Sequence, residues 1–317
     1  MACYYPLAAY RGKSKDADKI KIVFRRSESW RGQRLDLPCG RCIGCRLERS
    51  RQWATRCMHE ASLYDRNCFL TLTYDDAHLP LNGSLVKRDF QLFMKRLRKR
   101  YGSKIRFYMC GEYGESPGDG KSFGRPHYHA LLFNHSFSDQ RFFSRRQSGT
   151  LFTSDSLSEL WPFGFSVIGE VTFESAAYVS RYVMKKVTGE KAAAHYGDRV
   201  PEFTTMSRGC KRLGTGGIGK GWFEQFKSDV YPRDGVVVRG HIARPPRFYD
   251  DLLGREDRAL LEKLKIQREL NGFRYVDDVL PDGRVVKVSD RDSARLRVRE
   301  VCKLADISAL RRPLEEI

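Results

Sequence analysis

Two histidines, His127 and His129, flank one tyrosine in a short segment, residues 124–133, that is otherwise mostly apolar. Side chains of a strand alternate between its two faces, so both imidazoles point the same way if this segment is a strand. Two imidazoles side by side on a rigid strand can bind one divalent metal ion. The alternative is a pair of surface histidines on a half-exposed strand.

A carboxylate is available as the third ligand at the end of the preceding expected strand, where Glu112 and Glu115 occur. If the two strands pair, an acid arrives beside the histidines; we expect Glu112, with Glu115 as its substitute. Each could instead be a solvated loop acid. Two histidines and one carboxylate leave open positions for substrate oxygen, which suits Mg²⁺ or Mn²⁺, with Zn²⁺ as an alternative.

Two tyrosines, Tyr178 and Tyr182, lie four residues apart in a segment expected to be a helix, residues 174–187. At about 3.6 residues per turn they share one face, one turn apart. Lys185 falls on the same stripe, flanked by Arg181 and Lys186. An apolar stripe lies largely opposite and comprises Ala176, Val179, Val183 and Met184. Cations beside phenols favour the phenolate and stabilise charge on a phosphate, although a core or an ordinary polar face is the alternative.

The elements that must position these residues follow a recognisable order. Strands are expected at 68–74, 105–110, 127–133 and 165–171, helices at 86–101, around 156–160 and at 174–187, and a loop at 111–126. The order β-α-β-β-α-β plus one helix predicts an α+β fold with a ferredoxin-like, or split βαβ, antiparallel sheet. We expect the helices on one face, which leaves the other face for the site.

The chain is divided by composition into three segments: a basic, cysteine-bearing segment at 1–60, the core at 61–190, and a C-terminal extension at 191–317 that packs on or flanks the core. The extension is expected to contain an amphipathic helix at 248–270 and a hairpin at 275–288. No signal-peptide pattern and no run of about 18 apolar residues occurs, so we expect a cytosolic protein with no membrane partner.

The charge balance favours a polyanionic partner. Against 39 Asp and Glu stand 58 Lys and Arg, a net charge of +19, interleaved with 15 Tyr and 19 Phe. Basic residues release counterions from phosphates, and aromatic rings stack on unpaired bases. This combination indicates single-stranded nucleic acid; a merely basic soluble protein is the alternative.

Three cysteines, Cys39, Cys42 and Cys45, have the spacing C-x2-C-x2-C and could form part of a structural Zn²⁺ site. The candidates for a fourth ligand are Cys3, Cys57 and His59. A full zinc ribbon would need a second close pair. The isolated thiols are expected to be buried and structural; these are Cys68, Cys110, Cys210 and Cys302.

A glycine-rich segment, residues 214–221, nearly fits the P-loop pattern but has Gly221 where magnesium binding needs Ser or Thr. We expect a flexible loop near the DNA backbone and no ATP hydrolysis. Strand separation would then come from a host helicase.

Three segments together resemble the HUH rolling-circle endonucleases: residues 69–73, Arg125–His129 and Tyr178–Tyr182, in that order. The paired tyrosines resemble the two-tyrosine branch, in particular the replication initiators of gokushovirus-type microviruses, which are small single-stranded DNA phages. Residues 39–45 and 217–223 are similar to flanking segments of that type. The likeness runs from about residue 36 to 255.

The resemblance implies a reaction. His127, His129 and Glu112 would hold a metal that polarises the scissile phosphate at the phage origin, while one tyrosine attacks and leaves a 5′-phosphotyrosine. The free 3′-hydroxyl would prime the host DNA polymerase, and the second tyrosine would later cleave the regenerated origin so that the displaced strand is rejoined. Lys185 would contact phosphate, in the cytoplasm of a bacterial host. A non-covalent metal-dependent nuclease and a non-catalytic single-stranded DNA binding or packaging protein are the alternatives.

Overall fold

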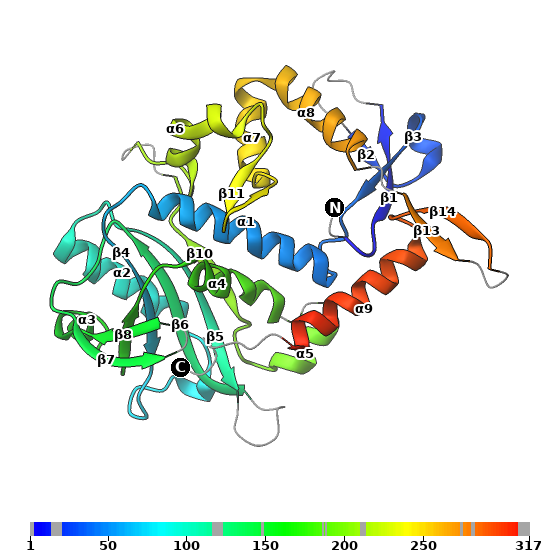
Figure 1. Ribbon diagram of the computed structural model, residues 1–317. Coiled ribbons are helices and arrows are strands. Elements are labelled where there is room, and N and C mark those ends of the chain that lie inside the picture. Colours follow the sequence, from blue (N-terminus) through cyan, green and yellow to red (C-terminus); the bar gives the residue numbers. More distant parts are fainter. Residues whose placement is uncertain are drawn as a thin grey trace. The chain divides into compact units, whose positions relative to one another are not determined.

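The structure is a computed structural model that describes residues 3–13, 21–115, 123–146, 149–185, 187, 189–209, 214–272, 275–279 and 283–309 (Figure 1). It divides into two compact units. The first comprises Met1–Glu48 with Glu262–Arg311, and the second is built on Arg49–Leu261. The three segments expected from composition stay a prediction about function, since each unit combines parts of them.

The second unit contains a seven-stranded antiparallel sheet in the order β10-β5-β6-β4-β9-β8-β7. Its strands are β4 (Asn67–Thr73), β5 (Arg106–Glu115), β6 (Phe123–Phe133), β7 (Arg141–Arg146), β8 (Gly149–Thr153), β9 (Ser166–Gly169) and β10 (Phe203–Met206). The helices of this unit are α1 (Ile43–Ala61, from Arg49 on), α2 (Lys87–Tyr101), α3 (Asp155–Leu160), α4 (Phe173–Lys185), α5 (Lys191–Tyr196), α6 (Lys220–Val230) and α7 (Arg247–Glu256). The prediction of an α+β fold with an antiparallel sheet is confirmed. A hairpin, β7–β8, is inserted between β6 and α3, and β10 extends the sheet at one edge.

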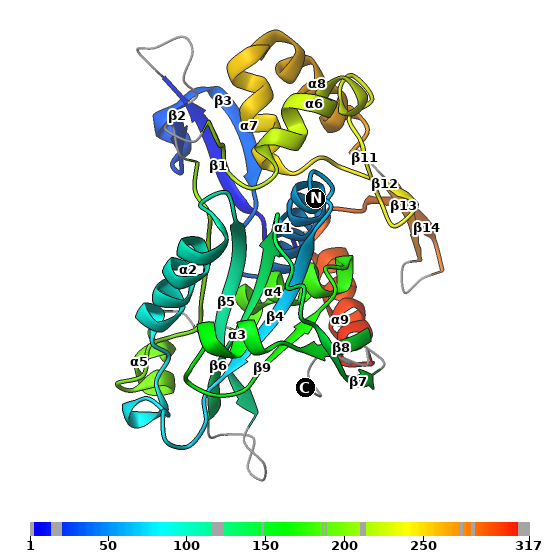
Figure 2. The same ribbon diagram turned by 90° about the vertical axis from the view of Figure 1, so that its left-hand side faces the viewer.

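Helices cover both faces of this sheet, so the expectation of helices on one face is wrong (Figures 1 and 2). Leu70 and Leu72 of β4 pack in one core with α2 and α3. Phe69, which points the other way, packs in a second core with α1 and α4. A central strand that is apolar on both sides has to be covered on both sides, and the continuous run of β4 already carried that signal.

The expected loop at 111–126 is also wrong at both ends, because β5 and β6 continue into it as paired strands. Glu112 lies opposite His127, and Tyr113 opposite Pro126. Gly111 suggested a loop, but its role is close packing: an added Cβ would lie 3.2 Å from the side chains of Leu85, Phe203 and Tyr128. The site acid is therefore on a rigid strand.

The expected helix at 248–270 is two helices, α7 and α8 (Arg258–Leu270). The chain becomes extended at Asp257, whose carboxylate accepts a hydrogen bond from the backbone N–H of Leu260 and so begins the second helix. Short strands β11 (Val236–Val238) and β12 (His241–Ala243) form a separate hairpin before α7.

The first unit is built on a three-stranded antiparallel sheet with the order β2-β1-β3. Its strands are β1 (Leu7–Gly12), β2 (Lys21–Val23) and β3 (Ser29–Leu37), and the predicted hairpin is confirmed as β13 (Tyr275–Val279) paired with β14 (Val285–Ser289). Helix α9 (Ser293–Ala309) follows. No helix in the described parts of the chain is long and apolar enough to cross a membrane.

Candidate metal centre and tyrosine helix

Three side chains converge on one face of the large sheet: Glu112 from β5, and His127 and His129 from β6. The Nε2 atoms of both histidines lie 2.8 Å from Oε1 of Glu112. One ligand atom from each residue lies within 4.8 Å of the others. The register explains this convergence, since Glu112 pairs with His127 and strand alternation returns His129 to the same face.

Hydrogen bonds on the outer side of each ring fix how the histidines face the centre. Nδ1 of His127 lies 3.0 Å from the carbonyl oxygen of Arg125, which can only accept, so this nitrogen carries the proton. Nδ1 of His129 lies 2.9 Å from Oγ1 of Thr71. Phe69 stacks on the His129 ring at a centroid distance of 5.5 Å. Both neutral rings therefore turn the lone pair of Nε2 toward Glu112, as metal-binding histidines do.

This donor set fits a divalent cation. The Glu112 and His129 side chains are 1% and 2% exposed, and His127 is 17% exposed. Oε2 of Glu112 is buried without a hydrogen-bond partner among the described residues. Burial opposes the charge of Glu112, but its hydrogen bonds with the two histidines outweigh burial and lower the pKa of the carboxyl to about 2. A buried carboxylate facing two imidazole lone pairs is a site that a positive charge stabilises.

Tyr178 of α4 reaches this cluster. Its hydroxyl donates a hydrogen bond to Oε1 of Glu112 at 2.9 Å and lies 3.5 Å from Nε2 of His129. Its ring meets that of His129 edge to face, with centroids 5.0 Å apart. A phenolic oxygen is thus within reach of any group bound at the three ligand atoms.

The expectation that Tyr178 lies on a non-core face of the helix is wrong, since the residue is 7% exposed and packs in the same core as Ala176 and Val179. Ser175 and Ser180 are buried as well, so the buried face is wider than its apolar residues and extends to Tyr178 at its rim. A helical wheel drawn from apolar residues alone missed this, because small polar residues also pack against the sheet.

Other predicted site residues lie outside the described side chains. Tyr182 and Lys185 are on α4, one turn and two turns beyond Tyr178, but only their backbone is described. The same holds for Glu115 at the end of β5. Of the two candidate acids, the structure brings Glu112 to the histidines.

Comparison with known proteins gives the family. The family model for replication-associated proteins of the ORF2 type matches residues 67–187. The replication-associated protein ORF2 of Spiroplasma virus 4 is 30% identical over 295 residues, which are 85% of this chain and 86% of that protein. The chain belongs to this family of replication-associated proteins.

Two further relatives match over shorter parts of their length. The replication-associated protein VP4 of Bdellovibrio phage phiMH2K is 34% identical over 68% of this chain and 66% of its own length. The replication-associated protein ORF4 of Chlamydia phage 1 is 30% identical over 68% of this chain and 53% of its own. The chain thus spans about two thirds and about half of these relatives. No solved structure matches.

The family match runs from β4 to the residues just after α4, so Glu112, His127, His129 and Tyr178 all fall within it. Sequence reasoning missed one residue of this replication-associated protein's site, Thr71. The signal was available: Thr71 is a polar residue in the β4 run, and it pairs with His129 across the sheet.

A second buried polar group, also missed, anchors the glycine-rich segment. The buried ion pair of Arg106 and Glu60 holds it at two points. Arg106 donates to the carbonyl oxygen of Gly216 at 2.9 Å, and the backbone N–H of Gly219 donates to Glu60 Oε2 at 2.6 Å. Residues 214–219 are therefore tied to the core, contrary to the flexible loop expected, and Lys220 begins α6.

The cysteine prediction has a divided outcome. Cys3 joins Cys39, Cys42 and Cys45 in one cluster. Cys57 and His59, the other candidates for fourth ligand, lie elsewhere: Cys57 is in the core under α1, and His59 stacks on Trp222 and contacts the Tyr249 hydroxyl. Cys68 and Cys110 are buried as expected, whereas Cys302 is exposed, and Cys210 lies outside the described residues.

Proposed function

We propose that the chain initiates phage rolling-circle replication by nicking single-stranded DNA at the origin, with Tyr178 as a nucleophile. One observation carries the proposal: the Tyr178 hydroxyl lies 2.9 Å from Glu112 within the Glu112–His127–His129 cluster. A structural tyrosine would have no need of two histidines and a carboxylate at its hydroxyl. The family to which the chain belongs supports a role in replication.

The arrangement of the sheet supports an HUH endonuclease core. Within the larger sheet the four strands of the core have the order β5-β6-β4-β9, and α2 and α3 connect them. In chain order this is 2-3-1-4, the arrangement in which a split βαβ unit interleaves its two halves. It places the first strand at the centre, where Thr71 supports the histidine strand.

The residues of the centre would divide the work of a transesterification. Bound Mg²⁺ or Mn²⁺ would polarise a non-bridging oxygen of the scissile phosphate. Glu112 holds the proton of the Tyr178 hydroxyl and so orients its lone pairs outward. The phenolic oxygen forms a bond to phosphorus, the bond to the 3′-oxygen breaks, and the phenolic proton ends on the new 3′-hydroxyl. The 5′-phosphotyrosine keeps the energy of the phosphodiester, so the strand can be rejoined without a nucleotide cofactor.

Tyr182 would act as the second nucleophile, because a spacing of one helical turn allows both phenols to visit one centre. Lys185, two turns from Tyr178 on the same helix, would contact the phosphate. The 3′-hydroxyl would be extended by a host polymerase behind a host helicase, in the cytoplasm of a bacterial host.

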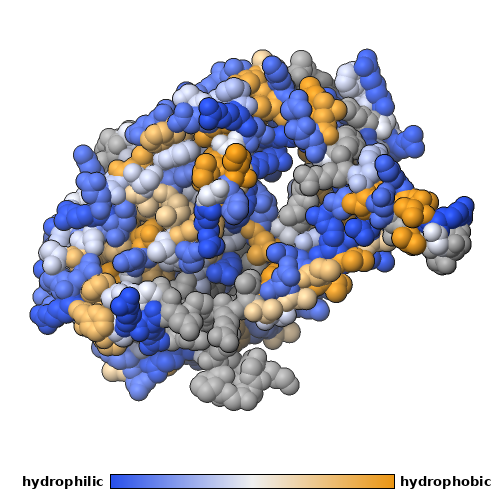
Figure 3. All heavy atoms as spheres, in the orientation of Figure 1, coloured by the Kyte–Doolittle hydropathy of each residue, from blue (hydrophilic) through white to orange (hydrophobic). Residues whose placement is uncertain are grey.

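A basic groove on the second unit supports single-stranded DNA as the partner. It has a volume of about 640 Å³ and runs between α2 and the β10 edge of the sheet. Its cations are Lys87, Lys95, Arg98, Lys99 and Arg208, its aromatic residues are Phe90, Phe107 and Phe203, and no carboxylate is among the described residues that line it. Cations with exposed ring edges suit a sugar–phosphate chain with unpaired bases. Hydrophilic residues also predominate on the molecular face in Figure 3.

A cleavage assay tests the proposal. Labelled single-stranded phage-origin DNA is incubated with Mg²⁺ or Mn²⁺, and denaturing gels detect a covalent protein–DNA adduct. We expect a metal-dependent adduct in the wild type that disappears in the Tyr178→Phe/Tyr182→Phe double variant, and the single variants rank the two nucleophiles.

Two other outcomes would replace the proposal. Cleavage that survives the double variant without an adduct would identify a nuclease that uses water. Binding without cleavage, across several origin sequences, would identify a DNA-binding or packaging protein.

A further inference from the structure

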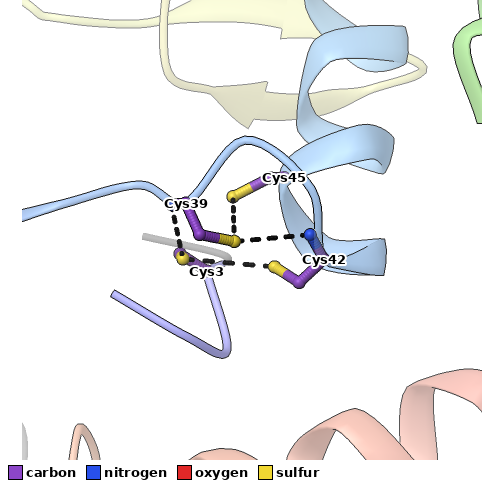
Figure 4. Close-up of side chains that lie close together, drawn as sticks. All are labelled: Cys3, Cys39, Cys42 and Cys45. Atoms are coloured by element: carbon purple, nitrogen blue, oxygen red, sulfur yellow. Dashed lines mark hydrogen bonds between the residues drawn. The ribbon is translucent and has the colours of Figure 1, made fainter. Parts of the chain in front are cut away.

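Four cysteines of the first unit meet at one point, far along the sequence from the tyrosine helix (Figure 4). Their Sγ atoms lie within 4.8 Å of one another, and the Cys39–Cys45 and Cys3–Cys42 separations are both 4.0 Å. A tetrahedron of sulfurs around Zn²⁺, at a bond length of about 2.3 Å, has edges of about 3.8 Å. The four sulfurs are therefore close to the positions of a tetrahedral tetrathiolate site.

The local fold explains why these cysteines meet. Leu7 at the start of β1 pairs with Leu37 at the end of β3, so Cys3 and Cys39 emerge from the same end of the sheet. Gly40 has a φ of +74°, which turns the chain tightly after Cys39. Cys42 follows that turn, and Cys45 lies in the first turn of α1.

Backbone groups are arranged to stabilise thiolates at this point. The N–H groups of Cys39, Cys42 and Tyr4 donate to the sulfurs of Cys3, Cys39 and Cys42, at 3.2, 3.3 and 3.4 Å. Such N–H···S bonds favour the charged sulfur, as does the positive end of a helix dipole at Cys45. Cys3 and Cys42 are 4% and 8% exposed, so water does not take this role.

The first unit also needs a cross-link, because its described hydrophobic core is small. The buried hydrophobic residues it contains are Cys3, Ala9, Val23, Cys42, Leu264 and Leu296. Two of these six are the cysteines themselves. Units with so little buried apolar surface usually require a metal or disulfides to hold their fold.

We propose that Cys3, Cys39, Cys42 and Cys45 bind one structural Zn²⁺ ion that joins the β1–β3 sheet to the N-terminal end of α1. Four protein thiolates fill the coordination sphere and leave no open position, so this site is structural rather than catalytic. It is separate from the Glu112–His127–His129 centre, whose nitrogen and oxygen donors suit a harder ion.

Metal analysis of the full-length chain tests the site independently of nicking. The His127→Ala/His129→Ala variant removes the other metal centre, and we expect it to keep close to one zinc per chain after dialysis. Replacing Cys42 and Cys45 by serine should remove that zinc, whereas Cys302→Ser, a matched change at an exposed thiol, should leave it in place. A histidine variant without zinc, or a Cys42→Ser/Cys45→Ser variant that keeps it, would overturn the proposal.

A second measurement on the unaltered chain covers the case in which the cysteine variants fail to fold. Native protein is treated with iodoacetamide and its cysteines are mapped by mass spectrometry. Cys302 should be alkylated at once, and the four clustered cysteines only after a chelator has removed the metal. Alkylation of the cluster at the rate of Cys302, disulfides in the untreated protein, or iron with visible absorbance in place of zinc would each refute the assignment.

Discussion

Replacing Thr71 by valine tests whether the strand behind the histidines tunes the metal centre. Valine keeps the shape of threonine but removes Oγ1, which lies 2.9 Å from Nδ1 of His129. Thr71 is 4% exposed and His129 is 2% exposed, so water has little access to replace the missing partner. The Nδ1–H group would then be buried without an acceptor, and the ring would no longer be held with Nε2 turned toward Glu112.

The size of the effect follows from the position of Thr71 behind a ligand. Loss of such an outer hydrogen bond typically weakens metal binding about 10–100-fold. At about 1.4 kcal/mol for each factor of ten, this is about 1.4–2.8 kcal/mol of binding free energy. The nucleophile is untouched, so we expect the metal concentration required for nicking to rise by the same factor while the rate at saturating metal changes less.

Mn²⁺ titration followed by electron paramagnetic resonance measures this affinity, since Mn²⁺ prefers oxygen and nitrogen donors to the four thiolates. Thr73→Val is the matched control: this residue is on the same strand and face, but its hydroxyl donates to the carbonyl of Phe165 rather than to a ligand. Equal Mn²⁺ affinity in Thr71→Val and wild type, with affinity lost in His129→Ala, would refute the reasoning.

Three further outcomes are expected elsewhere in the second unit. Glu60→Ala leaves the guanidinium of Arg106, 8% exposed, buried without its partner, so the free energy of unfolding in urea should fall by about 3–5 kcal/mol. Burial lowers the pKa of His59 to about 4, below the unfolded value, so its contribution to stability is complete above the unfolded pKa and is lost as pH falls toward the folded one. This loss is up to about 3 kcal/mol between about pH 6.5 and 4, and His59→Gln should flatten it in urea unfolding measured across pH. The double change Lys95→Gln/Lys99→Gln should weaken binding to single-stranded DNA and reduce the salt slope by about 0.7 for each phosphate that is no longer neutralised.

Each of these has a contrary result. Unchanged stability of Glu60→Ala would mean that water solvates Arg106 after all. A stability–pH slope that persists in His59→Gln would assign it to other groups. An unaltered salt slope in the lysine variant would place the DNA path away from the groove between α2 and β10.

The alternation of a strand was enough to predict part of the centre from sequence. It placed His127 and His129 on one face, and a short connection to the previous strand brought Glu112 into reach. What the alternation could not give was the register, which puts Glu112 rather than a later acid opposite His127. Register depends on pairing across the sheet, and no local pattern reports it.

The position of Tyr178 was misjudged for a different reason. The wheel ranked faces by hydrophobicity, but a helix that lies on a sheet buries small polar residues such as Ser180 along with apolar ones. Tyr178 then reaches the centre from the rim of that buried face. The fourth cysteine was equally unreadable, because Cys3 meets Cys39 only through the pairing of Leu7 with Leu37.

The glycine-rich segment shows how the same residue pattern can serve structure rather than nucleotide binding. In a P-loop, successive backbone N–H groups point at phosphate. Here the N–H of Gly219 points at the buried Glu60 carboxylate, and an added Cβ at this residue, whose φ is +81°, would lie 2.7 Å from the Tyr249 hydroxyl. An amide already bonded to a carboxylate is a poor phosphate donor unless Glu60 moves, which would leave Arg106 buried and unpaired. A tyrosine transesterase conserves the energy of the bond it cuts, so the proposed reaction has no need of a nucleotide at this segment.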